Sequence, residues 1–597
     1  MKDSKASGEV IAVLPNKVKI KVSDLNAFKG AEQLKVGSYI QISDNENSDV
    51  KLIAIIESFL IEVSEGKDGQ EDEGKRKYLI EANPLGTIED GIFRRGGDSI
   101  ALPPKEATKA SVDDIKAIYE SGSRESKYEK FCFAQLSQSS KDRIDVPING
   151  NKFFNKHFAI VGSTGSGKSH TTAKVLQNAT KEKKSDFTGL NNSHIVIFDI
   201  HSEYASAFPN ANIITIDDLI LPYWLLNAEE LEELFLESGD NNNYNQSSLL
   251  RSIITENKIV KNPSEIKVYF DSPLKFDIDE ILNCLQNLRK ETRHTEDDLN
   301  IQFVEDAIVF ESDSKKIQHY FKESFSFIAP RRESQARGHG ISKGPYCDGS
   351  IDKFVTRLNT KINSPRLRQF LFGEKSKEIS FEDTLRQFLG YSYKSEIRKN
   401  AKSNVTIIDL SGVPFEVLSI TVSLISRLLF DYSYYYKKQV GDNDMPLLLV
   451  YEEAHKYVPK SDLARFKSSR ASIERIAKEG RKYGISLAII SQRPSELSET
   501  IFSQCNNFIA MRLTNPDDQN YVKRLLPDTL GAITDILPSL QSGEALLIGE
   551  ATVMPSVVKI DKCDHEPSSN DIPYLEKWKN EWFDKVDFKN ITSKWIN

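Results

Sequence analysis

The chain has 597 residues, of which 39% are hydrophobic and 28% are charged, and its formal net charge is -8 at pH 7. This length allows roughly three or four domains with a substantial buried core, and the composition is that of an ordinary globular protein. The acidic balance disfavours a protein coated with basic nucleic-acid-binding residues, although basic residues could still line a pore. The 5 cysteines are scattered and form no C-x-x-C pair, which disfavours a zinc site or a disulfide framework.

Neither a targeting segment nor a membrane span is evident in the sequence. The first ten residues, MKDSKASGEV, lack the apolar core of a signal peptide. No run approaches the ~18 apolar residues that a membrane helix needs. We therefore expect a cytoplasmic protein with no membrane partner, and the unpaired cysteines favour the same reducing compartment.

The N-terminal part of the chain predicts a small β-barrel. Its β-rich runs are EVIAVLPNKVKIKVSD, VGSYIQISDN, VKLIAIIESFLIEV and KYLIEANPLGTI, separated by turn or charge-rich segments. About five or six short strands at this spacing are typical of a closed barrel. We assign residues 1–104 to this barrel and residues 105–150 to a connector.

From residue 151 onward, strands alternate with helices, which predicts an α/β domain with a mostly parallel sheet. The expected strands are Phe158–Val161, Ile195–Phe198, Val405–Leu410, Leu447–Tyr451, Ile485–Ile490 and Asn507–Leu513. The core should comprise residues 151–214 and 401–562. Residues 215–400 are polar and show helical periodicity, so we expect an inserted helical subdomain there, and residues 563–597 form a tail.

A glycine-rich loop follows the first strand of this domain. The segment GSTGSGKS fits G-x-x-x-x-G-K-[ST] without departure, between a strand and a helix, as a phosphate-binding loop requires. Backbone N–H groups at a helix N-terminus attract phosphate. We therefore expect ATP here, with Lys168 reaching the β- and γ-phosphates and Ser169 ligating Mg²⁺. The expected nucleotide-binding residues are Gly162, Ser163, Thr164, Gly165, Ser166, Gly167, Lys168, Ser169 and His170.

An acidic pair ends the apolar strand in PLLLVYEEAHKYVP. Phosphoryl transfer uses one carboxylate for the metal and another group for the attacking water. Adjacent strand residues point to opposite sides, so the pair can divide these roles. We assign Glu452 to Mg²⁺ and Glu453 to the water. His455 is either a structural histidine or a site residue.

A charged helical stretch lies between this pair and the next core strand. At 100° per residue, one face would carry Lys467, Arg470, Glu474, Lys478 and Arg481. Such a face is usually solvated, but nucleotide-hydrolysing sites can be completed by an arginine supplied in trans. Arg481 is the first candidate for that arginine, and Arg475 and Arg470 are the alternatives.

The strand that follows ends at a glutamine. Gln492 stands where a polar group could sense the γ-phosphate, and a plain loop glutamine is the alternative. We therefore expect the catalytic set to consist of Lys168, Glu453, Arg481 and Gln492.

Five segments in this order together resemble the HerA branch of the HerA–FtsK ATPases. They are HFAIVGSTGSGKS, FDIHSEY, YEEAHKYVP, IAKEGRKYGISLAIISQRPSEL and SQCNNFIAMRL. The resemblance covers most of the chain apart from the insertion and the extreme C-terminus. It implies a RecA-like P-loop ATPase domain preceded by a β-barrel, a homo-hexameric ring, and ATP-driven pumping of double-stranded DNA through the pore.

The same resemblance bears on individual acidic residues. Glu452 stands where many P-loop motors carry Asp. Asp199, His201 and Glu203 follow the second strand, where the family keeps an acidic cluster near the nucleotide. Glu203 is therefore expected at the site, whereas Asp199 is expected to be structural.

The resemblance leaves three settings open. HerA-like motors resemble the pump of an archaeal resection machine with a NurA-type nuclease, and similar bacterial proteins accompany a nuclease or a sirtuin-like NADase in antiphage defence. The Asn-, Lys- and Ser-rich composition favours the bacterial setting, because thermophile proteins tend to avoid Asn and Gln. An effector would be a separate chain. The rival class is an ATP-regulated scaffold that activates an effector without pumping DNA.

Two further segments are expected at surfaces. The loop APRRESQARGHGISKG offers Arg331, Arg332, Arg337 and His339 as DNA contacts or as a plain surface loop. In the tail, Trp578 and Trp582 are four residues apart and would share one side of a helix, and Trp595 follows. Such a tail should dock either on a neighbouring subunit or on its own.

Overall fold

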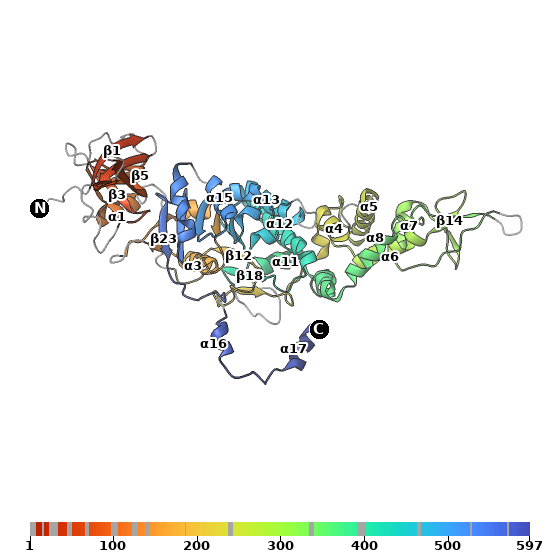
Figure 1. Cartoon of the computed structure of the whole chain (residues 1–597). Helices are drawn as coiled ribbons and strands as arrows, with labels where there is room; N and C mark the ends of the chain where they lie inside the picture. The colour runs from red at the N-terminus through yellow and green to blue at the C-terminus, as the bar shows by residue number, and fades with distance from the viewer. Residues whose placement is uncertain are drawn as a thin grey trace.

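The computed structural model arranges the folded parts in a row. A β-barrel lies at one end, a large sheet domain in the middle and an inserted arm at the other end, while the C-terminal tail leaves the sheet domain (Figure 1). The structure describes residues 8–14, 17–22, 34–43, 50–65, 71–96, 106–121, 129–137, 143–184, 187–236, 243–333, 339–391, 402–461, 467–525, 528–569 and 572–596.

The N-terminal barrel is closed, as predicted. Its ring runs β2-β1-β7-β3-β4-β5 and closes by antiparallel pairing of β2 with β5, while β6 pairs with β5 outside the ring. Alternating apolar residues point inward, as in β2, where Val18 and Ile20 are buried. The strands are β1 Gly8–Leu14, β2 Lys17–Val22, β3 Tyr39–Ser43, β4 Val50–Glu65, β5 Glu71–Glu89, β6 Ile92–Arg95 and β7 Glu106–Lys109.

The segment expected as a connector, residues 105–150, instead contributes to both neighbouring domains. Strand β7 completes the barrel between β1 and β3. Strand β9 (Ala134–Leu136) extends the central sheet by pairing with β23. These strands have only three or four residues, which is too short for a sequence pattern to detect, and β7 reads EATK with a single apolar residue. The other elements here are α1 Val112–Ser121, β8 Lys130–Phe131, β10 Ile148–Asn149 and α2 Gly150–Phe154.

The central sheet confirms the α/β expectation. Its order is β13-β18-β12-β19-β20-β11-β21-β22-β23-β9, parallel from β13 to β21 and antiparallel beyond. Every residue of β11, β19 and β20 is buried, as expected for strands covered on both faces. The strands are β11 His157–Val161, β12 His194–Asp199, β13 Asn212–Ile214, β18 Val405–Asp409, β19 Leu447–Tyr451, β20 Ile485–Ser491, β21 Cys505–Met511, β22 Glu544–Gly549 and β23 Ser556–Ile560.

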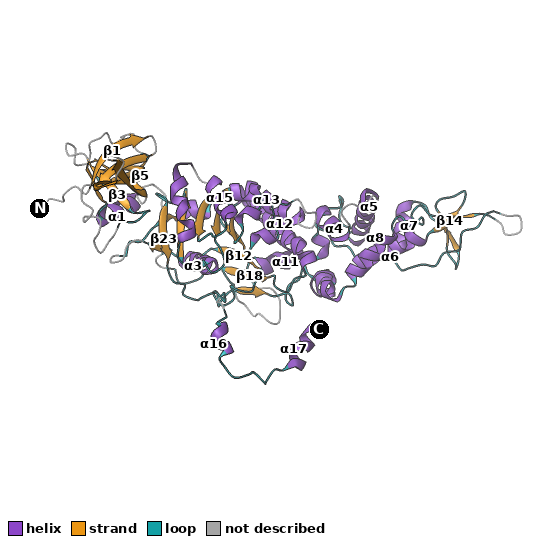
Figure 2. Cartoon of the chain, viewed as in Figure 1, coloured by secondary structure: helices purple, strands orange, loops and turns teal. Residues whose placement is uncertain are grey.

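Helices flank this sheet (Figure 2). Helix α3 packs on β11, and α13 packs on both β20 and α12. The helices of the domain are α3 Lys168–Lys181, α12 Phe415–Val440, α13 Lys467–Glu479, α14 Glu499–Ser503 and α15 Pro516–Leu525. Its short 3₁₀ segments are η5 Ala454–Lys456, η7 Gly480–Tyr483, η8 Pro494–Glu496 and η9 Asp528–Ser539.

The inserted arm lies between β13 and β18, which are neighbours in the sheet. It is mainly helical, as expected, but it also holds a four-stranded sheet, β16-β15-β14-β17, whose three-residue strands are too short to predict. Its helical elements are η3 Tyr223–Leu225, α4 Ala228–Phe235, α5 Asn243–Lys261, α6 Ile278–Lys290, α7 Asp313–Tyr320, α8 Asp352–Ile362, α9 Pro365–Leu367, η4 Arg368–Phe372, α10 Glu374–Glu378 and α11 Phe381–Phe388. Its strands are β14 Thr292–His294, β15 Asn300–Gln302, β16 Ala307–Val309 and β17 Ile341–Lys343.

A buried ion pair joins the arm to the sheet domain. Glu230 caps α4 by accepting from the backbone N–H of Asn227, and its side chain is 0% exposed. Arg427 on α12 donates to the same carboxylate at 2.8 Å, and Ser423 adds a hydrogen bond of 2.8 Å. A buried charge is tolerated only when it is paired in this way. The root of the arm is therefore fixed on α12.

The tail extends away from the body. It contains α16 (Tyr574–Trp578) and α17 (Phe588–Ile596). Trp578 and Trp582 are 72% and 89% exposed, and α16 ends at Trp578, so the expectation that both lie on one helix is wrong. The side chain of Trp595 lies outside the described part of the structure. Among the described residues, no helix is both long and apolar enough to cross a membrane.

Candidate nucleotide site

The glycine-rich loop runs from the end of β11 to the first turn of α3. Gly165 and Gly167 have positive φ angles of 72° and 103°, which a side chain rarely adopts. A Cβ on Gly162 would lie 2.6 Å from Oγ of Ser166 and 2.8 Å from Cβ of Met511. The pattern therefore places glycine where the backbone turns or approaches its neighbours closely.

Neighbouring strand ends hold this loop in place. The N–H of Gly162 donates to the carbonyl of Ser491 at the end of β20 (3.3 Å). The N–H of Ser163 donates to the carbonyl of Arg512, just after β21 (2.7 Å). On the other side, Gly543 donates to the carbonyl of Ser166 at 3.0 Å. Three backbone hydrogen bonds thus preorganise the loop for binding.

Lys168 and Ser169 begin the helix and face the carboxylates. The Lys168 ammonium donates to the carbonyl of Ser163 at 3.3 Å, so it lies inside the curve of the loop. Burial lowers the pKa of Lys168, and Glu453, Glu203 and Glu452 oppose that shift. The hydroxyl of Ser169 donates to Oε2 of Glu203 at 2.6 Å.

Glu452 lies among acidic neighbours just beyond β19. Its Oε2 accepts from the N–H of Ile200 at 3.0 Å, and the residue is buried. Burial raises the pKa of Glu452, and Asp199 and Glu203 raise it further. Asp199 itself accepts from the backbone N–H groups of His201, Glu203 and Tyr204, so it shapes this loop.

Glu453 adopts a left-handed conformation, with φ 46°. Its Oε2 lies 3.2 Å from Nδ1 of His455 and accepts from the N–H of Gln492 at 3.4 Å. The Gln492 side chain in turn accepts from the hydroxyl of Thr164 in the loop at 2.7 Å. Burial lowers the pKa of His455, whereas Glu453 raises it. The expected water-activating residue, the expected sensor and the loop are therefore linked in one network.

The ring of His170, a residue expected to contact the nucleotide, faces Cys563. Its Nδ1 lies 3.3 Å from Sγ of Cys563, and the thiol also donates to the His170 carbonyl at 3.1 Å. This contact ties the first turn of α3 to the start of the tail.

The residues at this site fit a nucleotide with Mg²⁺. Oγ of Ser166 is buried in the loop without a hydrogen-bond partner among the described residues, and Lys168 supplies a buried cation. Ser169, Glu203 and Glu452 offer the oxygen ligands that Mg²⁺ prefers. No closed metal cluster occurs among the described residues. Mg²⁺ normally binds through one or two protein ligands together with phosphates and water, so such a cluster is not required.

Comparison with known proteins finds similarity to HerA helicases. Residues 134–330 match the family described as "Helicase HerA, central domain". A probable DNA double-strand break repair helicase HerA from Methanocaldococcus jannaschii is 26% identical over 92% of this chain and 96% of its own length. The DNA double-strand break repair helicase HerA of Sulfolobus acidocaldarius is 26% identical over 80% of this chain and 78% of its own. The chain is therefore similar to HerA helicases over most of its length.

Among solved structures, VirB4 of Thermoanaerobacter pseudethanolicus resembles the HerA-like chain at 13% identity and a TM-score of 0.43, covering 75% of this chain and 98% of that one.

Arg481 lies outside the nucleotide site of its own chain. Helix α13 ends at Glu479, so Arg481 is on the 3₁₀ segment η7 and not on the predicted helix face. Segment η7 precedes β20, which is parallel to β11 with Phe158 opposite Ala488. The exposed Arg481 therefore lies at the sheet edge where β11 starts, whereas the phosphate loop follows the end of β11.

The alternative arginines have other partners. Arg475 lies over the ring of Phe430, with 4.5 Å from its guanidinium carbon to the ring centroid. Arg470 donates to Glu474 at 2.9 Å. Both contacts are within the chain, so Arg481 stays the first of the three candidates.

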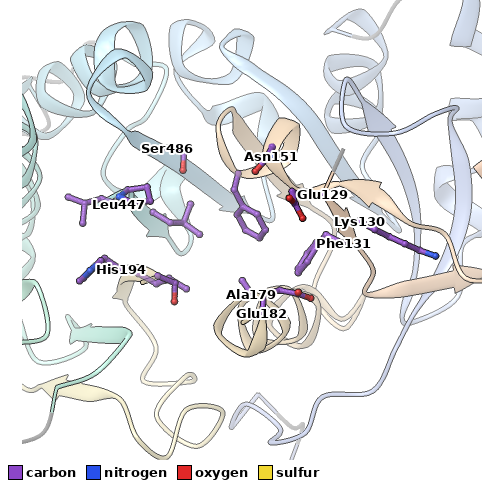
Figure 3. A pocket seen from close by; sticks show the side chains of 15 residues that line it. Glu129, Lys130, Phe131, Asn151, Ala179, Glu182, His194, Leu447 and Ser486 are labelled. Carbon is purple, nitrogen blue, oxygen red and sulfur yellow. The ribbon is translucent and has the colours of Figure 1, made fainter. Parts of the chain in front are cut away.

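A separate cavity of about 340 Å³ opens at the edge opposite the phosphate loop (Figure 3). Its lining includes Phe131, Ala179 near the end of α3, Glu182 just after that helix, and the strand starts at His194 and Leu447. Ligands of open α/β sheets bind at the carboxyl ends of the strands. This cavity is at the other end, so it is not the nucleotide site.

The described residues of the basic segment lie at β14, with which β17 pairs, far from α3 of the nucleotide site (Figure 1). The backbones of Arg331 and Ile341 pair in a short bridge. Arg337 lies outside the described residues.

Proposed function

We propose that this HerA-like chain is the ATP-driven motor of a hexameric double-stranded DNA translocase. The observation that carries the proposal is the network at the carboxyl ends of β11, β19 and β20, where Lys168, Glu453 and Gln492 meet around the phosphate loop. The relatives named DNA repair helicases support the choice of DNA as the substrate.

Each residue has a chemical role in this proposal. Lys168 neutralises charge on the β- and γ-phosphates, and the hydroxyl of Ser169 with the carboxylate of Glu452 would hold Mg²⁺. When bound, Mg²⁺ would supply charge stabilisation for the transferred phosphoryl group. Glu453 orients and polarises the attacking water. Gln492, which bonds to the loop through Thr164, senses the γ-phosphate.

The ring assembly rests on Arg481 and the tail. Arg481 is exposed and remote from its own phosphate loop, so it can serve a nucleotide only in a neighbouring subunit. The exposed tryptophans of the tail support docking on a neighbour, because tryptophan is enriched at interfaces. DNA contacts are assigned to Arg331, Arg332 and their loop.

For the biological setting we propose a bacterial antiphage defence complex with a separate effector, either a nuclease or a sirtuin-like NADase. The Asn- and Lys-rich composition supports this setting over a thermophilic one. The alternative setting is DNA-end resection with a NurA-type nuclease, which the archaeal repair relatives favour. A scaffold that activates an effector without pumping DNA would use the same nucleotide residues.

One set of measurements on the protein purified with its genomic neighbour separates these functions. Native mass gives the ring size and the partner. A translocase should show ATPase stimulated by duplex DNA, with duplex affinity falling steeply between about 50 and 200 mM salt. ATPase that is indifferent to DNA, together with effector activity that needs the ring, would favour the scaffold instead.

A further inference from the structure

The carboxylate of Glu453 and the phosphate loop come from strands that are not neighbours. The order β19-β20-β11 places β20 between them. Glu453 follows β19, and the loop follows β11. The end of β20 must therefore connect the two groups if the carboxylate is to be held at a fixed place relative to the phosphates.

Two groups connect Glu453 to the end of β20: the N–H of Gln492, which donates to Oε2 at 3.4 Å, and the ring of His455. Its Nδ1 lies 3.2 Å from Oε2 of Glu453 and also 3.2 Å from Oγ of Ser491, the last residue of β20. Ser491 is itself fixed at both ends, because its Oγ accepts from the N–H of Arg493 and its carbonyl accepts from the N–H of Gly162. One imidazole thus joins the carboxylate to a serine that also holds the loop.

The backbone explains why His455 can reach back. A left-handed residue such as Glu453 reverses the chain direction, and the 3₁₀ turn η5 follows at once, closed by the Lys456 N–H on the Glu453 carbonyl at 2.9 Å. A residue with a side chain adopts this region at an energetic cost, so it persists only where the surroundings fix it. The strained turn brings the ring of His455 back to the carboxylate of Glu453, two residues earlier in the chain.

We infer that His455 is a positioning residue for ATP hydrolysis, which holds the Glu453 carboxylate against the end of β20 so that it keeps one orientation relative to the phosphate loop. This inference rests on the proposed role of Glu453. His455 touches neither the loop backbone nor Lys168 in any described contact, so its loss should affect turnover and not nucleotide binding. Loss of a buried histidine that only fills space would not lower turnover while leaving nucleotide binding unchanged.

The test compares His455→Ala, which removes the ring, with His455→Asn, whose amide nitrogen can take the place of Nδ1. We expect kcat of the alanine variant to fall about 10- to 100-fold, with KM and the ATP dissociation constant unchanged. The asparagine variant should recover most of kcat. His194→Asn, a half-buried histidine at the far end of the same sheet, is the matched control and should keep the parent kcat.

Three outcomes would overturn the inference: a parent kcat in His455→Ala, a parallel loss of ATP binding, or an asparagine variant as slow as the alanine variant. Melting temperatures of all variants identify any that fail to fold, and His455→Asn then decides alone, by its kcat at unchanged ATP affinity. Glu453→Gln, measured alongside, separates the two proposals. If that variant hydrolyses ATP at the parent rate, the role of Glu453 fails. If it is inactive while His455→Ala is fully active, only the positioning role fails.

Discussion

The hydroxyl of Ser169 donates a hydrogen bond of 2.6 Å to Oε2 of Glu203. Glu203 thereby orients the serine that is assigned to Mg²⁺ and adds a negative charge beside it. In Glu203→Ala we expect the Mg²⁺ concentration for half-maximal ATPase to rise about 10-fold or more, because residues that orient metal ligands carry effects of that size. A Mg²⁺ titration of ATPase measures it, and Glu182→Ala, at the other end of α3, is the control. An unchanged Mg²⁺ requirement would remove Glu203 from the metal site.

Lys168 and Glu453 should differ in which step they affect. Lys168→Ala should lose ATP binding or turnover, since the ammonium is the buried cation inside the loop. Glu453→Gln should bind ATP with the parent affinity and lose hydrolysis, because an amide cannot polarise water as a carboxylate does. Equilibrium binding and ATPase rates of both variants test this. If Glu453→Gln remained fully active, Glu452 would be the next residue to substitute.

Arg481 should act across the subunit interface. Arg481→Ala and Lys168→Ala proteins should each be inactive alone, yet mixed rings should regain part of the ATPase, because some interfaces then pair an intact loop with an intact arginine. Lys482→Ala, on the same 3₁₀ segment, should keep the parent rate. Two variants that stay inactive in verified mixed rings would argue against Arg481 as the trans arginine.

The Glu230–Arg427 pair should stabilise the root of the arm. Arg427→Ala leaves the Glu230 carboxylate buried and without its cation, which should cost about 3 to 5 kcal/mol. Amide hydrogen exchange in α4 and α12 should accelerate accordingly. The control is Arg251→Ala, whose pair with Glu232 is exposed and should be worth at most about 1 kcal/mol. Equal effects of the two substitutions would contradict this account.

The buried ring of His157 should make the sheet domain sensitive to acid. Its Nε2 donates to the carbonyl of Ala477 at 2.9 Å, and its Nδ1 accepts from the N–H of Leu487 at 3.0 Å. Burial lowers the pKa of His157 from 6.5 to about 4. Between pH 6.5 and pH 4, the unfolded chain binds a proton at His157 more readily than the folded chain does. The stabilisation that the neutral His157 ring gives to the folded state is therefore complete above pH 6.5 and is lost as the pH falls to 4. The difference is roughly 3 kcal/mol.

Melting temperatures of the parent and His157→Asn between pH 7 and pH 4 test this. The variant should be less stable at neutral pH and should lose less stability across that window. Parallel curves for the two proteins would show that His157 does not titrate on unfolding.

The parts of the fold that were predictable from sequence are those with local causes. The loop from Gly162 to Ser169 is specified by glycines at positive φ and at close approaches, which are properties of single positions. The apolar runs of β11, β19 and β20 predict strands because both faces are buried. Strand β7 and the small sheet of the arm have only three or four residues per strand, so neighbours in space, and not their own sequence, determine them.

The candidate site shows the same division. Glu452, Glu453 and Gln492 were predictable because each follows a buried strand. The position of Arg481 was not predictable, because the helix α13 ends just before Gly480. At Gly480 a Cβ would lie 3.1 Å from the carbonyl oxygen of Ile485. Ser491 was missed although a serine before Gln492 is a visible signal, since its contact with His455 depends on how two strand ends meet in space.

Strands β13 and β18 lie side by side in the sheet, and the whole arm is the crossover between them. The arm therefore begins and ends at neighbouring positions of the sheet. The pairing of β13 with β18 requires only that the two strands be connected, whatever the length of the connection. The entropy of closing a connection grows by only about 0.6 kcal/mol for each doubling of its length. The arm can therefore be lengthened, trimmed or exchanged during evolution while the strand order of the ATPase sheet stays the same.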